Sequence, residues 1–165
     1  MMNEVYTVTT APTDYPVGLG EAKDWLRVDD TNSDAEISAL IAKATAYLEQ
    51  TYNRVFVSQT LELNLDCFPK EIRLHRAPVA SITEIKYIDT EGTEQTLAGS
   101  SYQADLRSEP ARIMPAYDNV WPSARLQYNA VTVKFVAGYS AVTLIPENLR
   151  QAVFLLVAHW FENRE

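Results

Sequence analysis

The chain has 165 residues, of which 47% are hydrophobic and 22% charged, and its formal net charge is −8. This size and composition are typical of a single globular domain with a substantial core. The acidic balance argues against a protein whose main task is to grip nucleic acid, which requires clustered lysines and arginines. It is compatible with a protein along which DNA passes without adhering, and its simplest meaning is solubility.

Cysteine content and apolar run length limit where the protein can work. Cys67 is the only cysteine, so no internal disulfide forms; a reducing compartment fits, and a secreted protein without disulfides would look the same. The N-terminal stretch MMNEVYTVTTAPTDYP has no basic region and no apolar run, so we expect no signal peptide. The longest apolar run, AVFLLVAHWF, is too short to span a bilayer, so we expect no membrane partner.

The first third of the chain predicts an extended arm and two helices. EVYTVTTAPTDYPV alternates at first and then breaks at two prolines, as an extended arm does. In GLGEAKDWLRVDD the apolar residues recur at helical spacing, which predicts a short helix with Glu21 near its positive end. Ser33 and Glu36 have the spacing of a capping box before a second apolar stripe. We expect this second helix to end near Asn53.

Residues 54–140 have the pattern of antiparallel strands. VFVSQTLELNLDCF alternates with period two, which predicts that Phe56 shares one face of a strand with the leucines that follow. The spacing of Ile82 and Ile85 predicts a bulge or a change of face. Two short strands are expected around the Glu109-Pro110 turn, NVWPSARLQYN is expected to be a loop, and AVTVKFVAGY is the last predicted strand.

Residues 145–165, IPENLRQAVFLLVAHWFENRE, predict a C-terminal helix with Pro146 in its first turn. One apolar stripe carries Leu149, Val153, Leu156 and Trp160. Further apolar residues widen this stripe beyond the ~100° that a simple amphipathic helix shows. One neighbouring element cannot cover so much surface, so we expect a second contact surface on this helix, formed by Phe154, Leu155 and Phe161.

The sequence shows no catalytic or metal-binding constellation. We expect Cys67 to be a small buried hydrophobe, His75 to face solvent, and His159 to be a satisfied core or interface histidine. Neither a phosphate-binding glycine loop nor a nucleophile elbow occurs. The acidic stretch DDTNSDAE lacks the glycine and the final glutamate of a calcium loop, so it is expected to cap a helix. We predict no catalytic residue, no cofactor and no metal.

Aromatic residues gather in the predicted loop and on the terminal helix. Tyr117, Trp121 and Tyr128 fall in or beside the loop, and Trp160 and Phe161 lie on the helix. Aromatic side chains are enriched at protein–protein interfaces, although filling of the core would also explain them. The residues predicted to form an oligomer or partner interface are Phe154, Leu155, Trp160, Phe161 and Trp121.

Taken in order, several blocks resemble the head–tail connector proteins of tailed phages and prophages, also called adaptors. These blocks are LGEAKDWLRVDD, DAEISALIAKATAYLEQTYNR, FPKEIRLHRAPVASITEIKYIDTEGTEQTL, YQADLRSEPARIMPAYDNVWP, NAVTVKFVAGY and IPENLRQAVFLLVAHWFENRE. Together they cover residues 19–165, and SEPARIMPAYDNVWPSAR is the most distinctive stretch.

The resemblance implies an α+β fold in a single connector domain, 1–165. Helices from 18–53 and 145–165 would pack together as the core, and the β-rich insertion 54–140 would lie at the periphery. The family has no known catalysis or cofactor in this role. Relatives usually continue beyond HWFENRE, so we expect that a C-terminal segment that reaches partners is missing after Glu165.

The resemblance also implies a structural role in the virion neck, after assembly in the host cytoplasm. Subunits would form a homo-oligomeric ring beneath the portal protein and extend the DNA channel toward a downstream neck or tail-completion protein. Genome DNA would pass without sequence-specific binding, and an acidic channel would repel its phosphates. Two alternatives stay open: another neck or tail-completion protein, and a small α+β domain that binds or converts an unknown ligand.

Overall fold

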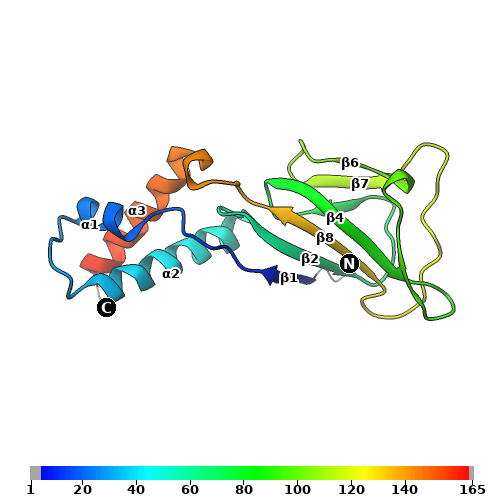
Figure 1. Cartoon of the computed structure of the whole chain (residues 1–165), viewed down its shortest axis with the longest axis horizontal. Helices are drawn as coiled ribbons and strands as arrows, with labels where there is room; N and C mark the ends of the chain where they lie inside the picture. Colours follow the sequence, from blue (N-terminus) through cyan, green and yellow to red (C-terminus); the bar gives the residue numbers. More distant parts are fainter. Residues whose placement is uncertain (1–4, 164–165) are drawn as a thin grey trace. The chain divides into compact units, whose positions relative to one another are not determined.

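The computed structural model describes residues 5–163, which divide into two compact units (Figure 1). The helical unit contains Pro12–Ser58 and the chain from Tyr139 onward. The β unit contains the strand before Pro12 and residues Gln59–Gly138. The single connector domain 1–165 stays a prediction, and the predicted loss of a segment after Glu165 concerns a position outside the described residues.

The helical unit is built from the three helices that the sequence predicts. These are α1 (Leu19–Leu26), α2 (Asp34–Tyr52) and α3 (Glu147–Glu162), with a short 3₁₀ turn at Val142–Leu144. The left-handed φ of 51° at Asn53 ends α2 as expected. The predicted capping box is wrong, because the Ser33 side chain makes no capping bond, and Lys23 Nζ instead holds the Asp34 carboxylate at 2.6 Å. No helix within residues 5–163 is both long enough and apolar enough to cross a bilayer.

The core of the helical unit lies between α2 and α3, with α1 closing one side. Phe56 belongs to this core and not to a strand, which corrects the sequence-based assignment. Its backbone N–H donates to the Glu49 carboxylate at 2.8 Å, and its carbonyl accepts from the Tyr139 N–H at 3.0 Å. These two backbone bonds fix the chain at Phe56, whose ring lies in the helical core, before the chain enters the β unit at Gln59. The buried residues are Val17, Ala22, Ile37, Ile41, Ala44, Leu48, Phe56, Val57, Ile145, Val153, Phe154 and Val157.

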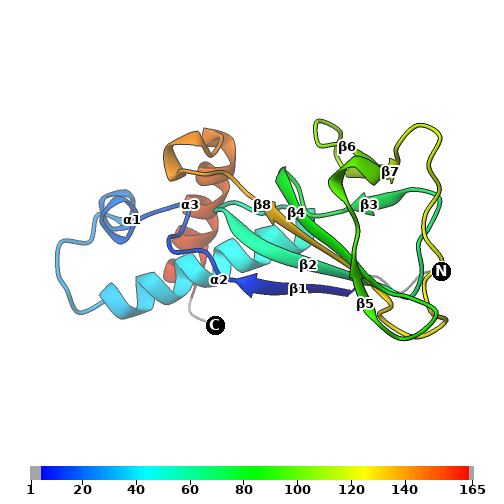
Figure 2. The same cartoon turned by 45° about the vertical axis from the view of Figure 1, so that its right-hand side comes forward.

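The β unit consists of two antiparallel sheets (Figure 2). The larger sheet has the strand order β1-β2-β8-β4-β5, and the smaller has the order β3-β7-β6. Their bounds are β1 (Val5–Thr10), β2 (Gln59–Leu65), β3 (Ile72–Leu74), β4 (Val79–Ile88), β5 (Glu94–Thr96), β6 (Tyr102–Asp105), β7 (Ala111–Pro115) and β8 (Val131–Ala137), with a 3₁₀ turn at Gly99–Ser101. Three helices with antiparallel sheets confirm the predicted α+β class.

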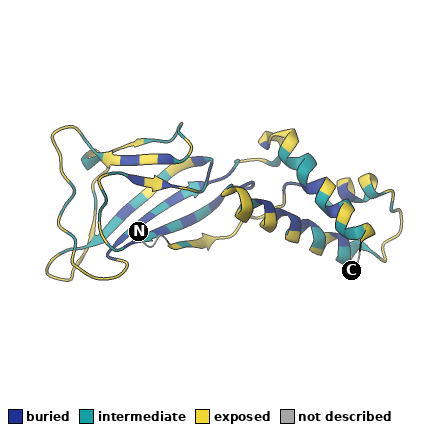
Figure 3. Ribbon diagram, turned by 180° about the vertical axis from the view of Figure 1, so that it is seen from behind, coloured by how far each residue is buried: buried dark blue, intermediate teal, exposed yellow. Residues whose placement is uncertain are grey.

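Strict alternation in β2 and β8 gives the β unit its core (Figure 3). Every second residue of these strands is buried, and the residues between are half-buried on the outer face. There Lys134 Nζ lies 3.9 Å from Glu62 and 3.8 Å from Glu84 across three neighbouring strands.

The predicted bulge is confirmed, since the register of β4 against β8 shifts between Ile82 and Glu84.

Candidate assembly surfaces

The described residues offer no candidate metal centre. Within residues 5–163 no group of three or more His, Cys, Asp or Glu side chains could hold a metal ion. Cys67 is exposed and not buried as expected, because it follows β2 at the point where the chain leaves the sheet. His159 is also exposed, beside Asn163 near the end of α3, while His75 faces solvent as predicted.

Phe154 has its packing partner inside the helical unit. Its ring stacks on Trp25 of α1, with ring centroids 5.2 Å apart and planes 26° from parallel. Only 8% of Phe154 is exposed, whereas 47% of Trp25 is. Phe154 is therefore largely covered within its own helical unit, and its role in contacts with another subunit stays a prediction.

The other candidates on α3 differ in how far their own chain covers them. Trp160 meets Tyr47 edge-on at 6.0 Å, and Lys43 Nζ lies 4.5 Å from the Trp160 ring centroid. Phe161 packs against the helical core while staying half-buried. Leu155 is 57% exposed and is the most accessible apolar side chain of α3. Among the four predicted residues of this helix, Leu155 is thus the one most available to a partner.

An apolar hollow opens on the helical unit between α2, α3 and the segment that follows α2. Its volume is about 240 Å³. Tyr52, at its rim, is 68% exposed and the most accessible aromatic side chain of this unit. The lining residues are Leu48, Tyr52, Arg54, Phe56, Leu149 and Ala152.

Arg150 ties α3 to the N-terminal part of the helical unit. Its Nε donates to the Pro16 carbonyl at 3.0 Å, and its guanidinium forms ion pairs with Glu21 and Glu147. The Gly18 N–H and then Arg150 hold the pKa of Glu21 below its ordinary value. Glu21 in turn raises the pKa of Arg150. The network fixes the entry of α1 against the first turn of α3.

Trp121 lies in the β unit, in the segment 116–130 that we call the strap. Its indole stacks on Phe68 with ring centroids 4.9 Å apart and planes 12° from parallel. Backbone N–H groups fix the strap further along, since Arg125 donates to the Ile88 carbonyl and Asn129 donates to Asp66 Oδ1, both at 2.9 Å. The strap has no regular secondary structure, but it is held at its middle and near its end.

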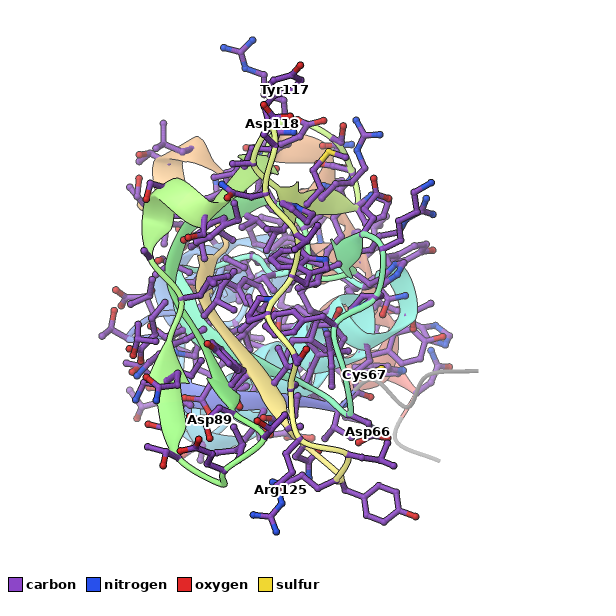
Figure 4. The ribbon with its side chains drawn as sticks, turned by 90° about the vertical axis from the view of Figure 1, so that its right-hand side faces the viewer. Asp66, Cys67, Asp89, Tyr117, Asp118 and Arg125 are labelled. Carbon is purple, nitrogen blue, oxygen red and sulfur yellow. The ribbon has the colours of Figure 1, made fainter. Side chains whose placement is uncertain are left out.

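The strap carries the four most exposed large hydrophobic side chains of the described residues. Figure 4 shows Tyr117 and Asp118 at the top of the view, where the strap begins, and Arg125 at the bottom. Tyr117 and Tyr128 stood out in the sequence as loop aromatics, but Val120 and Leu126 did not, because single apolar residues without a period carry no signal. The exposed fractions are 90% for Tyr117, 87% for Val120, 98% for Leu126 and 84% for Tyr128.

Charge is divided unequally between the two units. The β unit has ten acidic and eight basic side chains among its described residues. The helical unit has twice as many acidic as basic side chains. Its acidic residues are Asp14, Glu21, Asp24, Asp29, Asp30, Asp34, Glu36, Glu49, Glu147 and Glu162, against Lys23, Arg27, Lys43, Arg54 and Arg150.

Comparison with known proteins gives one family match and several structural matches. The model of the family described as head completion protein matches residues 18–165. No curated protein matches the chain.

Three similar solved structures are parts of gene transfer agent particles. The neck of an empty particle, with C6 symmetry, superposes with a TM-score of 0.83 at 24% identity, covering 98% of this chain and 85% of that chain. A chain of the native virion gives a TM-score of 0.80 at 24% identity, covering 98% and 86%. The neck of the native particle, with C12 symmetry, gives 0.70 at 28% identity, covering 100% and 85%.

Proposed function

The chain belongs to the head completion protein family, and on that premise we propose that it is a ring-forming subunit of a phage-type virion neck. A head completion protein is a structural component and not an enzyme. The ring would lie beneath the portal protein and extend the DNA channel toward a downstream neck or tail-completion protein. Assembly would take place in the host cytoplasm.

The likeness over the whole chain to a neck protein is the observation that carries this proposal. One neck chain superposes on 98% of this chain with a TM-score of 0.83, and another is 28% identical in a match that covers the whole of this chain and 85% of the neck chain. Those necks have C6 and C12 symmetry. Repeated copies around an axis are what a ring beneath a portal requires.

The accessible apolar side chains support self-association. Leu155 on α3 and the ends of the strap leave large apolar groups uncovered in the single chain. Aromatic and large aliphatic side chains are frequent at the centres of protein–protein contact sites. A closed ring would bury these groups without opening the fold.

The acidic surplus supports passage of DNA without adhesion. We place part of the channel wall on the helical unit, where acidic side chains outnumber basic ones two to one. Carboxylates there would repel DNA phosphates, in contrast to the lysine and arginine clusters of DNA-gripping proteins. Replacing the exposed Asp24 and Asp29 by asparagine should then make rings retain duplex DNA at low salt. Unchanged retention would remove this part of the proposal.

Electron microscopy of the purified protein, alone and mixed with its portal protein, tests the proposed function. We expect closed rings, with assembly promoted by high concentration or by the portal ring. Light scattering should report a species many times the mass of the 18.6 kDa chain. A protein that stays monomeric in both conditions, and does not sediment with the portal, would contradict the proposal.

A further inference from the structure

Strand β1 is an edge of the larger sheet that lacks the usual protection against pairing with another strand. Natural proteins guard such edges with charged side chains or proline, because unpaired backbone N–H and C=O groups invite a further strand. Of the four edge strands among the described residues, β3, β5 and β6 carry Arg73, Glu94 and Asp105. Strand β1, with the sequence VYTVTT, has no charge and no proline, and five of its six residues are exposed. Its register shift, between Val8 and Thr10, leaves the first four residues regular, so they are suited to receive a strand.

Strand β5 forms the opposite edge of the same sheet and directs part of its backbone outward. Its three residues are all exposed, whereas β3 buries two of its three residues and β6 is half-buried at both ends. The Leu97 N–H, directly after β5, donates to the Ile85 carbonyl of β4 at 2.8 Å. The bonding direction of an antiparallel strand reverses at each residue, so the N–H and C=O groups of Thr96 and Glu94 point away from β4.

We propose that β1 of one copy pairs with β5 of the next copy, so that the larger sheets of neighbouring subunits become continuous around the ring. This inference rests on the proposed function. A head-to-tail ring needs two different surfaces that complement each other on every subunit, and the two edges of one sheet meet this need. Pairing of β1 with β1 would join only two copies, and a strand from another protein would leave β5 without a partner.

The strand directions agree with such a ring. Every neighbouring pair in the larger sheet is antiparallel, and the order β1-β2-β8-β4-β5 therefore makes β1 and β5 run in the same direction. Copies related by the small rotation of a C12 ring, the symmetry of one similar neck, would bring β1 and β5 together as parallel strands. The outer face of each sheet would then continue into the outer face of the next.

The charge of β5 is already paired on the outer face of the sheet. Lys86 Nζ lies 3.0 Å from Glu94 and 4.0 Å from Glu84 there. Thr7 of β1 belongs to the same face, because the ring of its neighbour Tyr6 meets a buried phenylalanine ring on the inner face. Neutral side chains of β1 would lie beside a charge that is already compensated, so the pairing would bury no unpaired charge.

Thr96→Pro and the matched Thr96→Val test the edge of β5. Proline removes the outward N–H of this residue and spares the bonds toward β4, and edge strands tolerate proline at such positions. Valine keeps the N–H. We expect Thr96→Pro to raise the concentration needed for ring assembly on the order of tenfold, and Thr96→Val to leave it unchanged. Melting curves verify folding, and rings of folded Thr96→Pro at the wild-type concentration would overturn the inference.

Cross-linking tests the partner strand directly, and it still decides if the proline variant does not fold. In a Cys67→Ser background, protein carrying Thr7→Cys is mixed with protein carrying Glu94→Cys or Thr96→Cys and oxidised. We expect a disulfide-linked pair with one chain of each kind, and none with Gln95→Cys, whose side chain lies on the opposite face of the sheet. Rings without this cross-link, or equal linkage through Gln95→Cys, would overturn the edge pairing while leaving the proposed function intact. A wild-type chain that forms no ring, alone or with its portal protein, would remove both.

Discussion

The terminal helix of the helical unit and the strap of the β unit differ in how far they cover their aromatic side chains. In the helical unit, Phe154 is stacked against Trp25, and Trp160 is flanked by Tyr47 and Lys43. In the β unit, the tips of the strap leave Tyr117 and Tyr128 at least 84% exposed. A helix packed among other helices has neighbours that cover its large side chains. The strap contacts the β unit on one side only, so side chains on its other side stay exposed. Surplus apolar residues in a sequence therefore do not reveal whether the same chain covers them.

The largest expected effect on stability is a difference between a buried aromatic side chain, Phe154, and an exposed one, Tyr128. Phe154→Ala should lower the free energy of unfolding by about 3 to 5 kcal/mol, because it removes a ring that is 8% exposed and leaves a cavity. Tyr128→Ala should change it by less than about 0.5 kcal/mol. Urea titrations followed by circular dichroism measure both. Similar losses of unfolding free energy in the two variants would contradict the distinction between a covered aromatic side chain on α3 and an exposed one on the strap.

Trp121 tests whether the strap is held by stacking. Trp121→Ala should cost about 1 to 3 kcal/mol and speed amide hydrogen exchange along residues 116–130, because the contact with Phe68 is lost. Trp121→Phe should keep the stacking and also remove the indole N–H, which is buried without a hydrogen-bond partner. A phenylalanine variant that exchanges as fast as the alanine variant would show that stacking does not order the strap.

Substitution of Arg150 tests how much its hydrogen bond and ion pairs contribute to the stability of the helical unit. Arg150→Met keeps much of the apolar stem but leaves the Pro16 carbonyl and the Glu21 carboxylate without this donor, so we expect a loss of about 1 to 2 kcal/mol. Arg107→Met, at an exposed position of the β unit, serves as the control and should be neutral. Equal stability of both variants, measured by chemical denaturation, would mean that the network contributes nothing.

The smallest effect concerns the pH dependence of the Glu21 contribution. The pKa of Glu21 is lowered from 4.5 in the folded state, so the unfolded chain binds its proton more readily at acid pH. The stabilisation is therefore complete above the unfolded pKa and disappears as the pH falls through the folded pKa. Since the side chain is 51% exposed, we expect less than about 1 kcal/mol. Glu21→Gln should flatten this part of the curve in melts from neutral to acid pH, and an unchanged slope would contradict the assignment.

The sequence predicted much of the fold because the relevant signals are local. Apolar spacing located the helices, strand alternation located β2 and β8, and the mismatch of Ile82 and Ile85 located the bulge. Phe56 was misplaced because its alternation continues that of the next strand, while its backbone bonds to Glu49 and Tyr139 depend on the folded helices. Ser33 has capping spacing, yet Lys23 binds the first turn of α2 instead.

The candidate surfaces could be predicted only in part. The sequence showed that the terminal helix has more apolar residues than one neighbouring element can cover. It could not show that Trp25 stacks on Phe154 or that Leu155 stays accessible. Val120 and Leu126 are single apolar residues in an irregular segment, and their exposure depends on where Trp121 and Arg125 fasten the strap. Which side chains remain accessible is a property of the tertiary structure.

The anchoring of the strap at Trp121 and Asn129 has a consequence for how this protein can change over time. The anchors hold the strap on the β unit, whereas the side chains of Val120 and Leu126 are 87% and 98% exposed. Substitutions at Val120 or Leu126 can therefore accumulate without harm to folding, and selection on them comes from whatever they touch. The exposed residues of the strap can therefore change one at a time during evolution, and with them the contacts to partners, while the fold stays the same.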